Sequence, residues 1–198
     1  VIVLVIYLGI LVFWGVSVYD RIINRKIRQY LMILVGLMMF WMLMRTLRLT
    51  VLYHVFPLGQ WCWYAYYISM IFIPQFCLFA AKHIGKPEEY RPPRWMNYLY
   101  IPAGLFVLAV FTNDLHQLVF EFTEGFFWYD TIYSYRLLYF LIMAWFVSLG
   151  VYFVIALIRK CRIPGSRKMQ SLPLLVLGFA VVFWAQYCLN IFRDLDLT

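Results

Sequence analysis

The chain has 198 residues, of which 65% are hydrophobic, 21% aromatic and only 13% charged, with a formal net charge of +8. A water-soluble domain of this size needs more charged surface, so the composition excludes a soluble protein and predicts an integral membrane protein. In a soluble protein the positive charge would suggest nucleic acid. In a membrane protein, the positions of the basic residues along the chain must be considered before a partner is inferred. We therefore expect no nucleic-acid partner.

A helix that crosses the hydrocarbon core needs about 20 mostly apolar residues. The sequence predicts an all-α integral membrane protein, a polytopic bundle of six transmembrane helices in a single domain over 1–198. No basic leader or cleavage site accompanies the first apolar stretch, which favours a retained helix over a signal peptide. A half-apolar stretch, 115–129, is expected to lie along the membrane interface as a short helix. The six predicted spans are 1–19, 30–53, 60–81, 97–113, 132–158 and 171–192.

Basic residues concentrate in the first, third and fifth connections between these spans. The positive-inside rule therefore places these connections in the cytoplasm and the N-terminus outside, in a multi-pass protein of the cell membrane. Six spans return the chain to the outer side, so we expect it to be a fragment that stops before a seventh helix. The bases are Arg21, Arg25, Lys26, Arg28, Lys82, Lys86, Arg91, Arg94, Arg159, Lys160, Arg162, Arg167 and Lys168.

Two arginines lie in the outer part of the second predicted span. Arg45 and Arg48 are three residues apart, so both can face one side of the helix. Arginine keeps its proton, and an unpaired one at mid-helix costs about 2.5–3.5 kcal/mol. Two interpretations stay open. Either both side chains extend to the lipid headgroups, or they face an outer-side pocket with Arg136, paired with Asp114 or with an anionic ligand.

The segment "VFTNDLHQLVF" (110–120) is an apolar run that breaks into polar residues without a glycine or proline. Thr112 and His116 are four residues apart and share a face if the helix continues. The imidazole of His116 either has a structural role, capping the helix end or bonding Asp114, or it contacts a ligand or senses protons. The polar residues Asn113 and Asp114 lie between them.

Motifs of enzymes and of metal sites are missing: there is no HExxH, Walker loop, GxSxG or CxxC sequence. We therefore expect no cofactor, no metal and no catalysis by these residues. A small transporter or channel subunit, or an orphan multi-pass membrane protein, remains the alternative, although the spans offer few polar residues at mid-depth.

The stretch "IPAGLFVLAVFTNDLHQLVF" (101–120) has a proline, an apolar span and then Thr-Asn-x-x-His. It resembles the N-terminal seven-helix sensor region of bacterial histidine kinases, in which a "TN..H" signature closes the fourth helix. The continuation is similar too, with a fifth helix containing Trp145 and a basic "RKCRIPGSRK" turn. The resemblance makes Thr112, Asn113 and His116 the motif positions, and it implies an input module joined to a cytoplasmic kinase.

The sequence thus predicts the sensory input domain of a two-component receptor, which detects an extracellular or membrane signal in an outer-side pocket. We expect the lipid bilayer, a small anionic or lipid-like ligand and, in the full-length protein, a second copy as partners. The candidate sensing residues are Arg45, Arg48, Thr112, Asn113, Asp114, His116 and Arg136.

Overall fold

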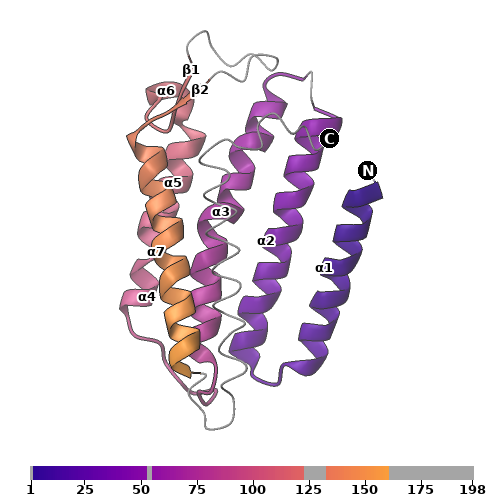
Figure 1. The fold of residues 1–198 in the computed structure, drawn as a ribbon, viewed down its shortest axis with the longest axis vertical. Helices are drawn as coiled ribbons and strands as arrows, with labels where there is room; N and C mark the ends of the chain where they lie inside the picture. Colours follow the sequence, from indigo (N-terminus) through magenta and orange to yellow (C-terminus); the bar gives the residue numbers. More distant parts are fainter. Residues whose placement is uncertain (1, 53–54, 123–132, 161–198) are drawn as a thin grey trace.

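The computed structural model describes residues 2–52, 55–122 and 133–160 of the chain. Most of these residues are helical, which confirms the helical class predicted from the composition. Helices α1, α2 and α3 lie side by side across the bundle (Figure 1). The elements are α1 (Ile2–Arg21), α2 (Arg25–Thr50), α3 (Leu58–His83), α4 (Trp95–Tyr98), α5 (Tyr100–Phe111), α6 (Asn113–His116), β1 (Phe120–Phe122), β2 (Tyr133–Tyr135) and α7 (Leu137–Lys160).

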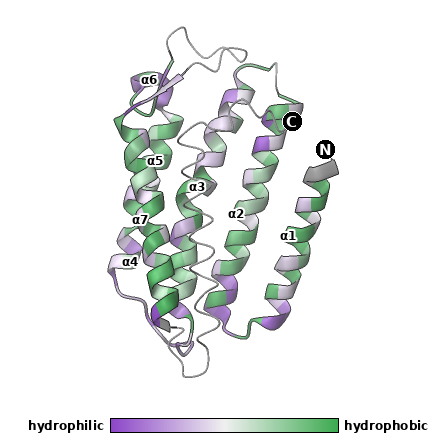
Figure 2. Ribbon diagram, in the orientation of Figure 1, coloured by the Kyte–Doolittle hydropathy of each residue, from purple (hydrophilic) through white to green (hydrophobic). Residues whose placement is uncertain are grey.

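Five predicted spans fall on helices: the first three on α1, α2 and α3, the fourth on α4 and α5, and the fifth on α7. Among the described residues, Arg25–Thr50, Leu58–His83 and Leu137–Arg159 are long and apolar enough to cross a membrane, and Trp95–Phe111 is a shorter apolar segment. Apolar residues cover the middle of these helices (Figure 2). The span 171–192 lies outside the described residues, so six crossings and an external N-terminus stay predictions.

The structure corrects the described part, up to Phe122, of the interfacial helix predicted for 115–129. The chain leaves helical geometry at Gln117, whose φ is +48°, and β1 (Phe120–Phe122) follows. This strand pairs antiparallel with β2, with Glu121 opposite Ser134. Residues 123–129 lie outside the described part of the chain. The bundle is therefore mostly helical rather than all-α.

The sequence of β1 explains the strand. Phe120 and Phe122 alternate with an acidic residue, the period of two that a strand requires, and aromatic side chains favour strands. Both phenylalanine rings lie beside Trp63 of α3, with ring centroids at 4.5 Å and 6.1 Å. Packing against α3 therefore stabilises an extended chain where the half-apolar composition alone suggested a helix.

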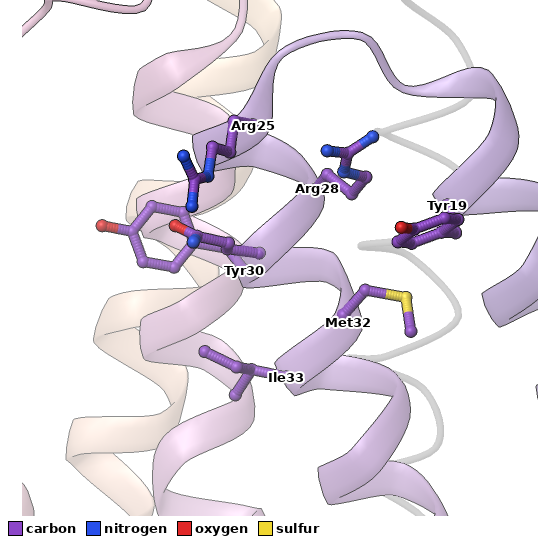
Figure 3. A pocket seen from close by; sticks show the side chains of 7 residues that line it. Tyr19, Arg25, Arg28, Tyr30, Met32 and Ile33 are labelled. Atoms are coloured by element: carbon purple, nitrogen blue, oxygen red, sulfur yellow. The ribbon is translucent and has the colours of Figure 1, made fainter.

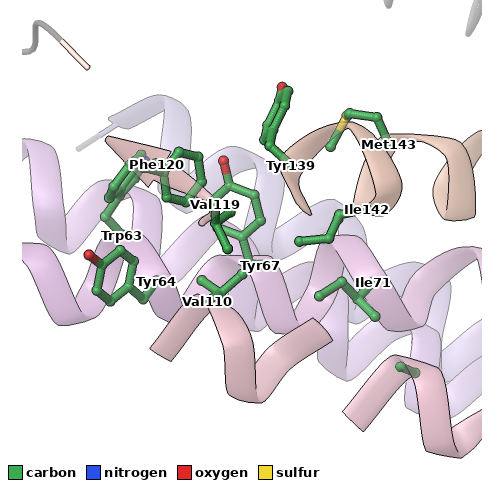
Figure 4. Packing of buried hydrophobic residues seen from close by; sticks show 11 residues of the cluster. Trp63, Tyr64, Tyr67, Ile71, Val110, Val119, Phe120, Tyr139, Ile142 and Met143 are labelled. Carbon is green, nitrogen blue, oxygen red and sulfur yellow. The ribbon is translucent and has the colours of Figure 1, made fainter. Parts of the chain in front are cut away.

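Helix α3 is the centre of the bundle, because α2, α5 and α7 all pack against it. Trp63, Tyr67 and Ile71 are spaced four residues apart, so they lie on one face of α3. Figure 4 shows Trp63 and Tyr67 near Phe120 and Ile71 further along the cluster, near Ile142. This face belongs to the larger core cluster. Its buried residues are Trp63, Tyr64, Tyr67, Ile71, Ala103, Val110, Val119, Phe120, Tyr139, Ile142 and Met143.

Helix α1 packs on α2. Its buried positions Leu11 and Val18, with Gly15 between them, recur at the spacing of one helix face. A Cβ atom on Gly15 would lie 3.3 Å from the side chain of Val35, so the glycine permits a close approach of the two helices. Small residues serve this purpose in membrane bundles, where van der Waals packing replaces the hydrophobic effect.

The two ends of the bundle differ in charge. The basic end contains the α1–α2 turn and the α3–α4 connection, and the opposite end, here the motif end, contains α6, β1 and β2 (Figure 1). At the basic end, the side chain of Asn24 caps α2 by accepting from the backbone N–H groups of Lys26 and Ile27 at 3.0 Å and 3.1 Å. This cap starts α2 five residues before the predicted span.

Candidate functional site

Asn113 is the centre of the polar turn at the motif end. Its side chain is fully buried at 0% exposure. Its Oδ1 accepts from the backbone N–H groups of Val119 and Phe120, both at 3.0 Å, and its Nδ2 donates to the carbonyl of Phe120 at 2.9 Å. The amide therefore uses both of its polar atoms to fold the chain from α6 into β1.

His116 caps the same turn. Its Nδ1 accepts from the backbone N–H of Leu118 at 2.9 Å, and its Nε2 lies 3.2 Å from Oγ1 of Thr112. Because a backbone N–H can only donate, Nδ1 carries no hydrogen, and the neutral ring donates from Nε2 to Thr112. Thr112 in turn donates to the carbonyl of Leu108 at 2.8 Å. The capping role is the one that this geometry supports.

Asp114 ties the turn to α3. Its Oδ1 accepts from Nε2 of Gln60 at 2.7 Å and from the hydroxyl of Tyr64 at 2.6 Å. Gln60 and Tyr64 are 4% and 1% exposed, so the carboxylate is the partner that satisfies two buried donors. Neither His116 nor any arginine of the described chain pairs with Asp114, contrary to the pairing considered from the sequence.

The two arginines of α2 do not converge on this turn. Arg45 is exposed, and its guanidinium lies 5.7 Å from the ring centroid of Trp41 on its own helix. Arg48 is half-buried against α3, with its guanidinium 5.3 Å from the ring of Trp63 and Nη1 donating to the hydroxyl of Tyr66 at 3.5 Å. Although they are only three residues apart, the two side chains have different surroundings. Arg45 lies on the outside of α2, and Arg48 lies between α2 and α3.

Arg136 lies at the junction of β2 and α7. Its guanidinium forms an ion pair with Glu121 of β1, and the side chains of both residues are partly exposed. Its backbone N–H donates to the carbonyl of Val119 at 3.1 Å, and that of Leu138 donates to Leu118 at 3.2 Å. The hairpin ladder therefore continues into the first residues of α7.

The His116 turn and the Arg136 ion pair border one hollow, here the motif-end groove, of about 490 Å³. Its wall combines one imidazole and one ion pair with apolar side chains of α7. Of the seven predicted site residues, His116 and Arg136 line it. Its lining residues are His116, Gln117, Leu118, Glu121, Arg136, Leu137, Leu138 and Leu141.

A family model described as the N-terminal 7TM region of histidine kinase matches residues 1–198. The chain belongs to this family. The match confirms the resemblance seen in the sequence and, with the apolar helices, a multi-pass membrane protein. In this histidine kinase 7TM region the motif residues Thr112, Asn113 and His116 build a hydrogen-bonded turn. No curated protein and no solved structure matches the chain.

Sequence reasoning missed three residues of this region: Gln60, Tyr64 and Glu121. Gln60 and Tyr64 are four residues apart in "GQWCWYAYY", so their shared helix face was a signal that polar groups of α3 meet a partner. Glu121 gave a weaker signal, as an isolated acid between two phenylalanines.

Proposed function

We propose that this chain is the sensory input domain of a histidine kinase and that it detects a small anionic or lipid-like ligand in the motif-end groove. Family membership supports the sensory role. The observation that carries the ligand class is the partly exposed Arg136–Glu121 ion pair beside the leucines of α7.

The chemistry of the groove suits a carboxylate or phosphate attached to an apolar tail. The planar guanidinium of Arg136 can bind either anion with two hydrogen bonds. An exposed ion pair contributes about 0–1 kcal/mol, so a ligand anion can replace Glu121 at little cost. Leu137, Leu138 and Leu141 then provide apolar surface for the tail.

The position of the ion pair offers a route for the signal. Arg136 connects β1 and the polar turn to the start of α7, and α7 runs from the motif end to the basic end (Figure 1). A ligand that replaces Glu121 favours one arrangement of the hairpin relative to α7. Only such unequal binding to two arrangements can change the output of the kinase.

The distribution of charge supports an external groove. Most basic residues of the described chain gather at the end opposite the groove, and the positive-inside rule assigns that end to the cytoplasm. The basic side chains there are Arg21, Arg25, Lys26, Arg28, Lys82, Lys86, Arg91, Arg94 and Arg159.

The proposal is tested with the full-length kinase in nanodiscs, with octanoate as the anionic probe and octanol as the neutral one. We expect octanoate, and not octanol, to change the rate of autophosphorylation, and the Arg136→Gln variant to need about tenfold more octanoate for the same change, which corresponds to about 1.4 kcal/mol. Arg45→Gln, the matched control on α2, should respond like the wild type. Equal octanoate responses in Arg136→Gln and Arg45→Gln would refute the groove as the site.

A further inference from the structure

A second hollow lies at the basic end, far from the motif-end groove. This basic-end groove has a volume of about 470 Å³ and is lined by residues from the end of α1 and the start of α2. Its lining residues are Tyr19, Arg25, Arg28, Gln29, Tyr30, Met32 and Ile33.

Two guanidinium groups lie at the mouth of the basic-end groove. Arg28 lies over the ring of Tyr19, 4.9 Å from its centroid, so a contact from α1 holds it across the gap between the helices (Figure 3). The one ion pair of the described chain joins Arg136 and Glu121, so no carboxylate of that part forms an ion pair with the guanidinium of Arg25 or Arg28.

The backbone of the helix start is already occupied, so recognition in this groove depends on the side chains. The backbone N–H of Arg25 donates to Oε1 of Glu88 at 3.1 Å, and the next two N–H groups donate to Asn24. Glu88 therefore places its carboxylate on the end of the helix. The guanidinium groups of Arg25 and Arg28 remain the cationic groups that face the groove.

The deeper wall of the groove is apolar. Met32 and Ile33 are 38% and 41% exposed. They lie about two turns further along α2 than Arg25 and about one turn further than Arg28. At about 1.5 Å per residue, they lie roughly 10 Å from Arg25 along the helix axis. Figure 3 shows the arginines nearer the turn and Met32 and Ile33 deeper in the bundle. A free phosphate would use only the mouth, whereas a phospholipid has a phosphate and an acyl chain at this separation.

We propose that the basic-end groove binds an anionic phospholipid. The phosphate lies between Arg25 and Arg28, and the first part of one acyl chain follows Met32 and Ile33. The excess of bases at this end raises the local concentration of anionic over zwitterionic headgroups, at about 1 kcal/mol for each base near the membrane surface. This site lies at the opposite end from the proposed signal site and does not depend on it.

The experiment measures lipid binding by the detergent-purified full chain, with native mass spectrometry, during titration with phosphatidylglycerol. Phosphatidylcholine and inorganic phosphate are the comparison arms. We expect phosphatidylglycerol to bind at least tenfold more tightly than phosphatidylcholine and phosphate alone to compete poorly. The double variant Arg25→Gln/Arg28→Gln should weaken phosphatidylglycerol binding at least tenfold. Its matched control, Arg91→Gln/Arg94→Gln, removes the same charge from exposed positions outside the groove and should change binding less than twofold.

A second variant keeps the test decisive if the double variant folds poorly. Ile33→Trp fills the apolar part of the groove from a partly exposed position and leaves both charges in place, so it should weaken phosphatidylglycerol binding about tenfold. Equal losses of phosphatidylglycerol binding in Arg25→Gln/Arg28→Gln and in Arg91→Gln/Arg94→Gln would show that only the total positive charge matters. Strong competition by phosphate alone, or full binding to Ile33→Trp, would show that the groove takes a free anion. Either outcome overturns the proposal.

Discussion

Two buried amide side chains show how differently this bundle treats polar groups in its interior. Asn113 at the motif end and Gln75 in α3 are both fully buried, at 0% exposure. Asn113 makes three hydrogen bonds to the backbone of the next turn, whereas within the described chain neither side-chain polar atom of Gln75 has a partner. Burying an amide is costly unless it is hydrogen-bonded. Asn113 therefore stabilises the fold, whereas Gln75 gains no compensating hydrogen bond from the described residues.

Gln75 lies in a part of the bundle where other polar side chains do form hydrogen bonds between helices. It follows Pro74, which removes a backbone N–H from α3. Other polar groups of the central helices are bonded between helices: Ser69 donates to the carbonyl of Leu37 at 2.8 Å, and Nε1 of Trp145 donates to the carbonyl of Ile71 at 3.4 Å. Gln75, whose amide has no partner among the described residues, thus lies in the helix that contacts α2, α5 and α7, where a change of packing reaches most of the bundle.

The largest effect is expected for Asn113→Leu. The variant keeps the side-chain volume roughly similar but leaves two backbone N–H groups and one carbonyl of the turn without partners, at about 1–3 kcal/mol each. We expect the free energy of unfolding to fall by at least about 3 kcal/mol, measured by titration with a denaturing detergent. Asn97→Leu, at an exposed position of α4, is the matched control and should change stability by less than about 0.5 kcal/mol. Similar decreases in the free energy of unfolding of the two variants would show that Asn113 has no special structural role.

Gln75→Leu should have the opposite sign. The leucine has nearly the same size and needs no hydrogen bond, so we expect the free energy of unfolding to rise by about 1–2 kcal/mol. The same change at Gln60, on the same helix, removes a donor to Asp114 and should lower it by about 1–2 kcal/mol. If Gln75→Leu also destabilises the protein, the amide has a partner in the native state and the contrast with Asn113 disappears.

The smallest of the three effects is expected for His116→Ala. This variant removes the cap on the Leu118 N–H and the bond to Thr112, both at the partly exposed edge of the turn. Loss of a hydrogen bond at a partly exposed site of this kind costs about 1 kcal/mol. Leu115→Ala, whose side chain is 86% exposed, should change stability by less than about 0.5 kcal/mol in the same detergent titration. A wild-type stability of His116→Ala would show that the ring is not a structural cap.

Much of this molecule could be predicted from local sequence. Apolar stretches of membrane length located the helices, because each span must satisfy its own backbone in lipid. The alternating basic connections separated the two ends by charge. The polar residues from Thr112 to His116 identified the motif turn, and the capping role of His116 was one of the alternatives that its spacing suggested.

Other features depended on partners that lie far apart in the sequence. Asp114 bonds two residues of α3 that precede it by 50 and 54 positions. Arg136 finds Glu121 because β1 pairs with β2, where the sequence suggested a helix. The spacing of Arg45 and Arg48 allowed both to face one side of α2, yet α3 packs against Arg48 while Arg45 is exposed.

The sequence by itself determined the membrane class, the position of most helices, the charged end and the motif turn, because composition, span length and near-neighbour spacing are local properties. Only the tertiary structure decided which buried polar groups have partners, where the hairpin forms and which charged residues border each groove. These outcomes depend on how helices pack against one another, and a single helix does not contain that information.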